Sequence, residues 1–168
     1  KPFSRNRDAC ELYNVGHLYE AAVAHYEVTG KRTLLDVATR NADLVAKTFG
    51  LGEGQSRETS GHEEIEIGLC RLYQATGDAK YLRLAQHFID MRGRKDLRPV
   101  WGAAYQDHKP VLEQKEALGH AVRASYLYAG MADVAALTGN TAYVDAIDAL
   151  WENVVGRKLH LNGGIGAR

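Results

Sequence analysis

The sequence predicts an all-α fold, and two observations carry this prediction. Apolar residues recur with the period of a helix along almost the whole chain, and no stretch alternates convincingly as a strand does. A Thr-Gly pair followed by polar residues and an apolar run occurs three times, starting at Thr29, Thr76 and Thr138. Each repeat is read as the turn of a helical hairpin, and their uneven intervals disfavour a tandem superhelix. About three hairpins with long insertions between them indicate part of an (α/α)6 barrel, with no substantial sheet.

The hairpins follow one another in order along the chain. The first carries the apolar positions Leu12, Val15, Tyr19, Ala22 and Tyr26, and then Leu34, Ala38, Ala42 and Val45. The second begins with "SGHEEIEIGLCRLY", residues 60–73, and the third lies within "YQDHKPVLEQKEALGHAVRASYLYAGMADVA", residues 105–135. In each turn the glycine supplies a left-handed helix end, and the polar residues that follow start the return helix.

Composition excludes several classes of function. The chain has 168 residues, enough for one domain or part of one, with 45% hydrophobic residues and 21 basic residues balanced by 21 acidic ones. No basic stripe indicates nucleic-acid binding, and no apolar run is long enough to span a bilayer. The chain also lacks an initiator Met and a signal peptide. Few cysteines and no signal favour the cytoplasm, while a truncated N-terminus would leave the periplasm and secretion open.

The start of the second hairpin has a structural explanation. Ser60 and Glu63 have the spacing of a capping box, in which each side chain satisfies a free backbone N–H of the first turn. Glu64 adds negative charge at the positive end of the helix dipole. Capping therefore accounts for these residues without any catalytic role. It does not account for His62.

A Gly-His pair occurs in the first helix of every hairpin, at His17, His62 and His120. If these helices run parallel around an inner ring, the three imidazoles face one cavity, and the glycines allow a backbone or a ligand to approach closely. Three histidines are compatible with zinc, but neutral imidazoles also hydrogen-bond to hydroxyls, and sugar binding is favoured. Glu66 shares a face with His62 and either contacts the sugar or forms an ion pair at the edge of the core.

A second group of polar residues precedes the third hairpin. Asp107 and His108 lie in a loop before Pro110, which is expected in the first turn of a helix. A loop of this composition at a cavity rim suits substrate contacts, and capping is the alternative. Cys10 and Cys70 are isolated among apolar neighbours and are expected to be buried thiols, so no metal site is predicted.

Four stretches together resemble a known family. They are "ELYNVGHLYEAAVAHYEVTGKRTLLDVATRNAD", "GHEEIEIGLCRLYQATGDAKYL", "QDHKPVLEQKEALGHAVRASYLYAGMADVAALTG" and "NGGIGAR". They resemble glycoside hydrolase family 127, the bacterial β-L-arabinofuranosidases. The resemblance implies an (α/α)6-barrel catalytic domain that releases L-arabinofuranose from plant glycans or hydroxyproline-linked arabinosides with retention. It also implies that His17, His62 and His120 contact the sugar.

The chain departs from the family pattern in one respect. The family uses a zinc-bound cysteine nucleophile with a Glu-x-Cys motif, a later Cys-Cys pair and a glutamate acid/base, and none of these occurs here. In the family those elements follow the Gly-Gly-Ile-Gly segment. The resemblance therefore implies that residues 1–168 are a single partial domain, the N-terminal half of the barrel, which binds sugar but holds neither the zinc nor a catalytic residue.

Two alternatives remain open from the sequence. One is another α/α-barrel sugar enzyme, such as an epimerase or an unsaturated glucuronyl hydrolase, whose activity is independent of zinc. The other is a non-catalytic helical module that binds a partner protein and exposes an apolar groove. A half-barrel also exposes apolar inner surface, so a homodimer is a further expectation.

Overall fold

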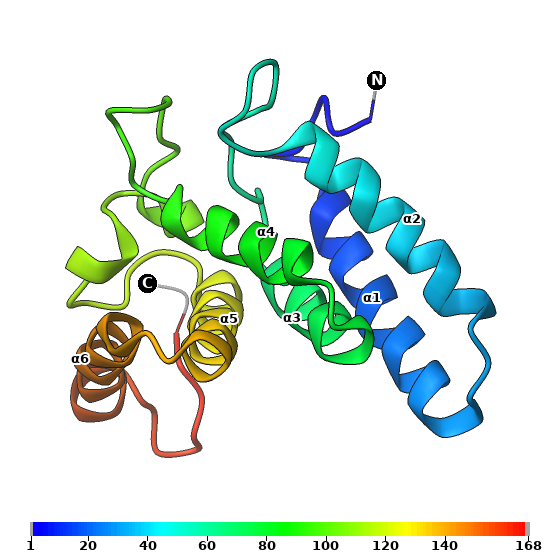
Figure 1. Cartoon of the computed structure of the whole chain (residues 1–168). Helices are drawn as coiled ribbons and strands as arrows, with labels where there is room; N and C mark the ends of the chain where they lie inside the picture. The colour runs from blue at the N-terminus through cyan, green and yellow to red at the C-terminus, as the bar shows by residue number, and fades with distance from the viewer. Residues whose placement is uncertain (1, 167–168) are drawn as a thin grey trace.

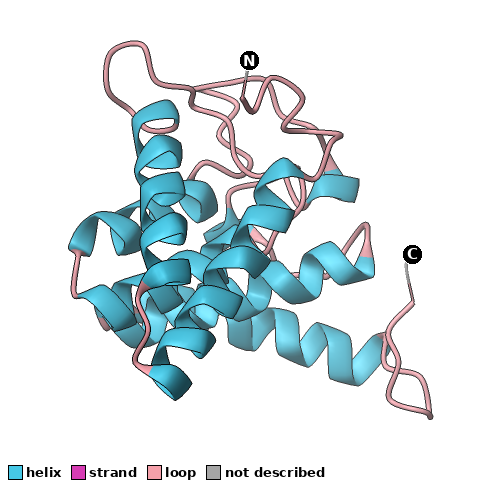
Figure 2. Ribbon diagram, turned by 90° about the vertical axis from the view of Figure 1, so that its right-hand side faces the viewer, coloured by secondary structure: helices cyan, strands magenta, loops and turns pink. Residues whose placement is uncertain are grey.

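The computed structural model describes residues 2–166, and this part of the chain is helical (Figures 1 and 2). Its helices are α1 (Glu11–Thr29), α2 (Thr33–Thr48), α3 (Ile65–Thr76), α4 (Ala79–Asp90), α5 (Ala121–Thr138) and α6 (Thr141–Arg157), with short 3-10 helices η1 (Ala103–Tyr105) and η2 (Val111–Glu113). The described residues form isolated bridges but no strand. None of these helices is long and apolar enough to cross a membrane.

The three Thr-Gly turns join the helices into hairpins as the sequence predicts. The glycines that end α1, α3 and α5 have φ of 69°, 73° and 70°. At Thr76 the hydroxyl donates to the carbonyl of Leu72 at 2.6 Å and accepts the N–H of Asp78 at 3.2 Å. The other two turns repeat both bonds at Thr29 and Thr138. The prediction of hairpin turns is therefore confirmed in detail.

The hairpins are arranged as part of an (α/α)6 barrel, with one layer made by their first helices. In this layer α3 lies between α1 and α5, while α2 and α4 pack on the outside (Figure 1). The helices of this layer approach closely where they carry glycine. A Cβ added to Gly68 would lie 2.6 Å from the carbonyl oxygen of Gly16, and one added to Gly130 would lie 3.0 Å from the Cβ of Glu66. The first contact brings α1 against α3, and the second brings α5 against the start of α3.

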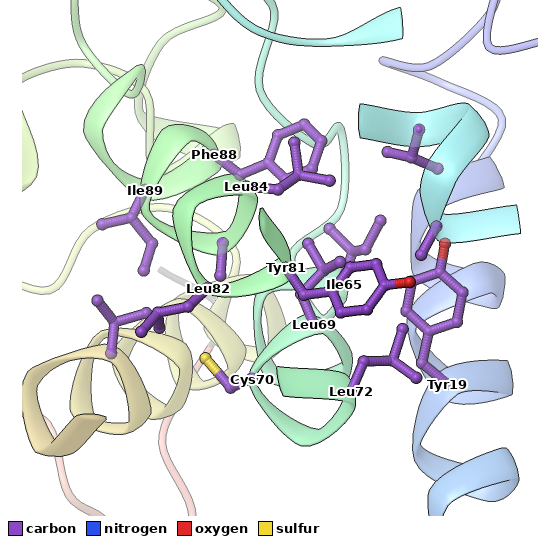
Figure 3. Close-up of a cluster of buried hydrophobic side chains, with 14 of the residues drawn as sticks. Tyr19, Ile65, Leu69, Cys70, Leu72, Tyr81, Leu82, Leu84, Phe88 and Ile89 are labelled. Carbon is purple, nitrogen blue, oxygen red and sulfur yellow. The ribbon is translucent and has the colours of Figure 1, made fainter. Parts of the chain in front are cut away.

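The hydrophobic core is centred on α3 and α4. Figure 3 shows side chains of both helices meeting one another and α1. The buried set includes Tyr19, Ile65, Leu69, Cys70, Leu72, Tyr81, Leu84, Phe88 and Ile89. Each large apolar side chain contributes about 1.5–3 kcal/mol when it leaves water. Cys70 is buried within this core as a small apolar side chain, as expected, whereas Cys10 is only partly buried.

The two ends of the hairpins differ in construction. The turn end consists of the three Thr-Gly turns. The loop end consists of the connections 49–64 and 91–120, which meet where Arg92 contacts Ser60 and Glu63. Residues of this end supply most of the candidate site.

Two expected helix starts at the loop end are wrong. The second hairpin begins at Ile65 and not at Ser60; its N-cap is Glu64, with φ of 154° and no side-chain cap bond. The capping box does not form, because Ser60 and Glu63 instead face Arg92. In the third hairpin, Pro110 starts only the short η2, and α5 begins at Ala121.

Candidate functional site

The structure brings the three Gly-His histidines into one cluster with two tyrosines. His17 and His62 both pack edge-on against Tyr13, with ring centroids 4.5 and 4.4 Å away. His62 lies 6.1 Å from His120, and Tyr126 lies 5.9 Å from His17 and 6.1 Å from His62. These five rings, called the histidine cluster below, come from α1, from α5 and the residue that precedes it, and from the loop before α3. The predicted convergence of the imidazoles is thus found in the structure.

The histidines reach the cluster from different local structures. His17 lies within α1, but His62 and His120 precede their helices. A ring nitrogen of His62 lies 2.9 Å from the carbonyl oxygen of Glu63, and His120 caps α5 by accepting the N–H of Arg123 at 3.4 Å. Burial lowers the pKa of His62, which favours the neutral imidazole. The expectation that all three lie inside first helices was therefore wrong for two of them.

The glycine beside each histidine marks a close approach of two chain segments. A Cβ on Gly16 would lie 2.7 Å from the Cα of Ile65 and would also meet the carboxyl of Glu64. A Cβ on Gly61 would meet the backbone of Asn6 and Arg7, and one on Gly119 the backbone of Ala103. Substitution at any of the three requires the backbone to move. The glycines thus allow the close packing that positions the neighbouring histidines.

A buried charged network lies beside the cluster. Arg92, just after α4, pairs with Glu63 at 2.8 Å and with Glu66 at 3.3 Å, and the side chains of all three are fully buried. The same guanidinium donates to the hydroxyl of Ser60 at 2.7 Å. Burial raises the pKa of Glu63 to about 8, although Arg92 acts in the opposite direction. One cation thus serves two carboxylates.

Glu66, a sugar contact in the sequence-based prediction, belongs to this network. Its Oε1 accepts from the hydroxyl of Ser60 at 2.7 Å, and its Oε2 accepts the N–H of Glu64 at 3.0 Å. With Arg92 as a third partner, the carboxylate is occupied by the protein itself. The structure therefore supports the ion-pair alternative, in which Glu66 holds the start of α3.

Asp107 also has a structural environment. It is fully buried and accepts the N–H of Gly93 at 2.7 Å, the N–H of Trp101 at 2.6 Å and the guanidinium of Arg98 at 2.5 Å. These bonds hold the connection 91–120 together and leave little capacity for a ligand. His108 is half-buried, and burial lowers its pKa. It does not pack against the histidine cluster in the described structure, so neither residue joins the three histidines there.

A third group of ionisable residues adjoins His17. Its Nδ1 lies 3.2 Å from Oε1 of Glu64 and 3.6 Å from Oε2 of Glu20. Burial, with Glu20 nearby, raises the pKa of Glu64 to about 10. Within residues 2–166 these three are the set whose ligand atoms are close enough together for a metal ion, and it contains no thiol. Burial raises the pKa of the Cys70 thiol to about 12, so neither this cysteine nor this cluster fits a zinc-thiolate centre.

The chain's relatives are enzymes of one family. The family model described as "Beta-L-arabinofuranosidase, GH127 catalytic domain" matches residues 3–168. The chain belongs to the GH127 family. It is 38% identical to a non-reducing end β-L-arabinofuranosidase of Bifidobacterium longum subsp. longum, over 98% of this chain and 28% of that protein.

Solved GH127 structures share its fold. A β-L-arabinofuranosidase from Geobacillus stearothermophilus T6 is 44% identical, with a TM-score of 0.92 over 99% of this chain and 29% of that one. The β-arabinofuranosidase BT3674 is 48% identical, with a TM-score of 0.91 over 99% of this chain and 26% of that one. The GH127 chain therefore spans under a third of the length of these relatives.

Proposed function

We propose that the protein is a β-L-arabinofuranosidase and that this chain supplies its sugar-binding histidines. The observation that carries the proposal is the histidine cluster of a GH127 chain. Its imidazoles offer hydrogen-bond donors and acceptors to hydroxyl groups, and the tyrosine rings offer apolar faces to the C–H groups of a sugar. His17 is 41% exposed in its side chain, so a ligand has access to it. An L-arabinofuranosyl glycan is the proposed substrate.

The contribution of this chain to catalysis is binding and orientation. The family resemblance implies a retaining reaction at a zinc-bound cysteine. The residues of this chain do not fit such a centre, so we assign the zinc to other residues of a longer protein. Hydrogen bonds from three fixed histidines orient the sugar and reduce the entropy that the reaction must lose. The chain by itself is then a binding half, the N-terminal half of the barrel, without hydrolytic activity.

The proposal also covers the oligomeric state and the cellular location of the protein. Exposed apolar side chains in the described part, among them Leu118, Val122, Trp151 and Val155, support a homodimer or contact with the rest of a barrel. Sedimentation of the chain would distinguish a dimer from a monomer. Cytoplasmic location is proposed from the scarcity of cysteine, and cell fractionation would test it.

The test is hydrolysis of p-nitrophenyl β-L-arabinofuranoside by the longer parent protein. His17→Ala, His62→Ala and His120→Ala are each expected to lower kcat/KM about tenfold or more, since each removes a hydrogen bond of about 1–2 kcal/mol from the bound sugar. His25→Ala, in the same helix as His17 and outside the histidine cluster, is the control and should change kcat/KM less than twofold. An active parent that tolerates all three cluster changes would show that the Gly-His pairs serve packing alone.

A further inference from the structure

Glu64 has a buried carboxyl group that lacks well-aligned hydrogen-bond donors from its surroundings within residues 2–166. Its side chain is fully buried, yet neither carboxylate oxygen has a well-aligned hydrogen-bond donor among the described residues. The carboxyl lies against the Cα of Gly16, in space that a side chain there would fill. Its backbone is held at φ of 154°. A buried carboxylate without partners costs several kcal/mol, so this arrangement requires a compensating proton or cation.

The groups that face Glu64 restrict how it is compensated. His17 Nδ1 is 3.2 Å from Oε1 of Glu64, and Oε2 of Glu20 is 3.6 Å from the same nitrogen. The ligand atoms of the three residues lie within 4.8 Å of one another, so the two carboxyl groups are neighbours. Burial and the neighbouring Glu20 raise the pKa of Glu64 to about 10, so at neutral pH it is protonated. The proton of Glu64 is directed toward the neighbouring Glu20 carboxyl. The remaining carboxyl oxygens then act only as acceptors toward the imidazole.

We propose that Glu64, supported by Glu20, is a positioning residue that holds His17 in the tautomer with its hydrogen on Nδ1. A small rotation of the ring aligns this N–H with Oε1 of Glu64. Nε2 on the far side of the ring then carries a lone pair and accepts a hydrogen bond from a ligand hydroxyl. A buried hydrogen-bond partner on one imidazole nitrogen fixes the role of the other in this way. The inference deepens the proposed function, because the ligand on Nε2 is the sugar.

The arrangement explains why Gly16 precedes His17. An added Cβ at Gly16 would collide with the Glu64 carboxyl, so glycine at this position admits the group that orients the next residue. Tyr13, one helical turn earlier, also packs against the His17 ring, with centroids 4.5 Å apart. In the proposed arrangement the imidazole is held both by packing against Tyr13 and by hydrogen bonding to Glu64.

The experiment is a ¹⁵N NMR measurement of the His17 imidazole in this chain, which needs no sugar and no activity. The expected spectrum shows a protonated Nδ1 and an unprotonated Nε2 at neutral pH. Glu64→Gln should keep this pattern, because the amide oxygen still accepts from Nδ1–H and the amide NH₂ donates to Glu20. Glu64→Leu, which keeps the volume but removes the acceptor, should give a mixture of tautomers. A predominantly Nε2-protonated His17 in the unsubstituted chain would overturn the proposal, as would an unchanged tautomer in Glu64→Leu.

A bound divalent metal ion would also explain why His17, Glu20 and Glu64 lie close together. The same NMR spectra distinguish a metal site from the proposed hydrogen bond. Added zinc chloride should leave the His17 resonances unchanged at equimolar concentration. Stoichiometric loss of the Nδ1 proton on adding zinc, abolished in Glu64→Gln, would replace the proposal with a metal site.

In the longer parent protein, Glu64→Leu should lower kcat/KM about as much as His17→Ala, and Glu64→Gln should retain most of it. Failure of the proposed function would leave the tautomer result standing. An active parent in which Glu64→Leu has full activity would contradict the positioning role.

Discussion

The turn end and the loop end of the hairpins are stabilised by different kinds of interaction. At the turn end the bonds are short-range, as in the threonine hydroxyl that donates to the carbonyl four residues earlier. At the loop end the bonds join residues far apart in sequence, such as the side chain of Asn6 with the carbonyl of Thr59 and the hydroxyl of Thr59 with the carbonyl of Phe88. The turns are therefore specified by neighbouring residues in the sequence. The candidate site depends on contacts between residues that are far apart in the sequence.

Charge distinguishes the two ends as well. The charged residues of the turns are solvent-exposed, whereas the loop end buries the ion pairs of Arg92 and Arg98. Exposed pairs contribute at most about 1 kcal/mol, but breaking a buried pair leaves an uncompensated charge and costs far more. The loop end is therefore the part of the molecule most sensitive to single substitutions.

The largest expected effect comes from Arg92→Met. It leaves Glu63 and Glu66 buried without their cation, and we expect the free energy of unfolding to fall by about 3–5 kcal/mol. Urea denaturation followed by circular dichroism measures this loss. Arg94→Met is the matched control, because its pair with Asp96 is exposed and its loss should leave the urea denaturation midpoint almost unchanged. Equal losses for the two variants would contradict the difference between buried and exposed charge.

The pH dependence of stability provides a second test of the comparison. Burial raises the pKa of Glu64 to about 10 from an ordinary value of 4.5, so folding retains a proton that the unfolded chain releases. The stability linked to Glu64 is complete below its unfolded pKa and falls as pH rises toward 10, by at most about 1.4 kcal/mol per pH unit. Glu64→Gln should remove this slope in urea titrations between about pH 5 and pH 9, where the unfolded carboxyl is ionised.

Asp78, at the turn end, should behave in the opposite sense. Its pairing with Lys80 lowers the pKa of its carboxyl, so the stability it contributes is present at neutral pH and is lost as pH falls. Asp78→Asn should therefore change only the acid limb of the same titration. A change in the alkaline limb for Asp78→Asn, or none there for Glu64→Gln, would count against this assignment.

The sequence predicts features that depend on local patterns better than features that depend on distant contacts. The hairpins, their glycine caps and the convergence of His17, His62 and His120 depend on helical period and on repeated motifs. Tyr13 was missed although it precedes His17 by one helical turn, a spacing that places both on one face. The role of Arg92 could not be predicted, because no local pattern links it to Glu63.

The errors have the same physical origin. Ser60 and Glu63 have the spacing of a capping box, but a buried guanidinium is a stronger partner for a carboxylate than a backbone N–H, and it takes both side chains. The helix start moves to Ile65 as a result. Where charged side chains are buried, ion pairs between distant residues thus determine the helix start more strongly than the local capping pattern does.

The smallest expected effects are at the helix caps of the turn end. Asn140 accepts the N–H of Ala142 at 3.1 Å and Asp78 accepts that of Lys80 at 3.1 Å. Asn140→Ala and Asp78→Ala should each lower the free energy of unfolding by about 1 kcal/mol. Arg32, which makes no side-chain cap for α2, is the control, and Arg32→Ala should cost no more than about 0.5 kcal/mol. Because each cap acts only on its own turn, the double variant should lose the sum of the two single losses to within about 0.5 kcal/mol. A larger deviation would show that the turns are coupled through the core, and the local character of the turn end would then be wrong.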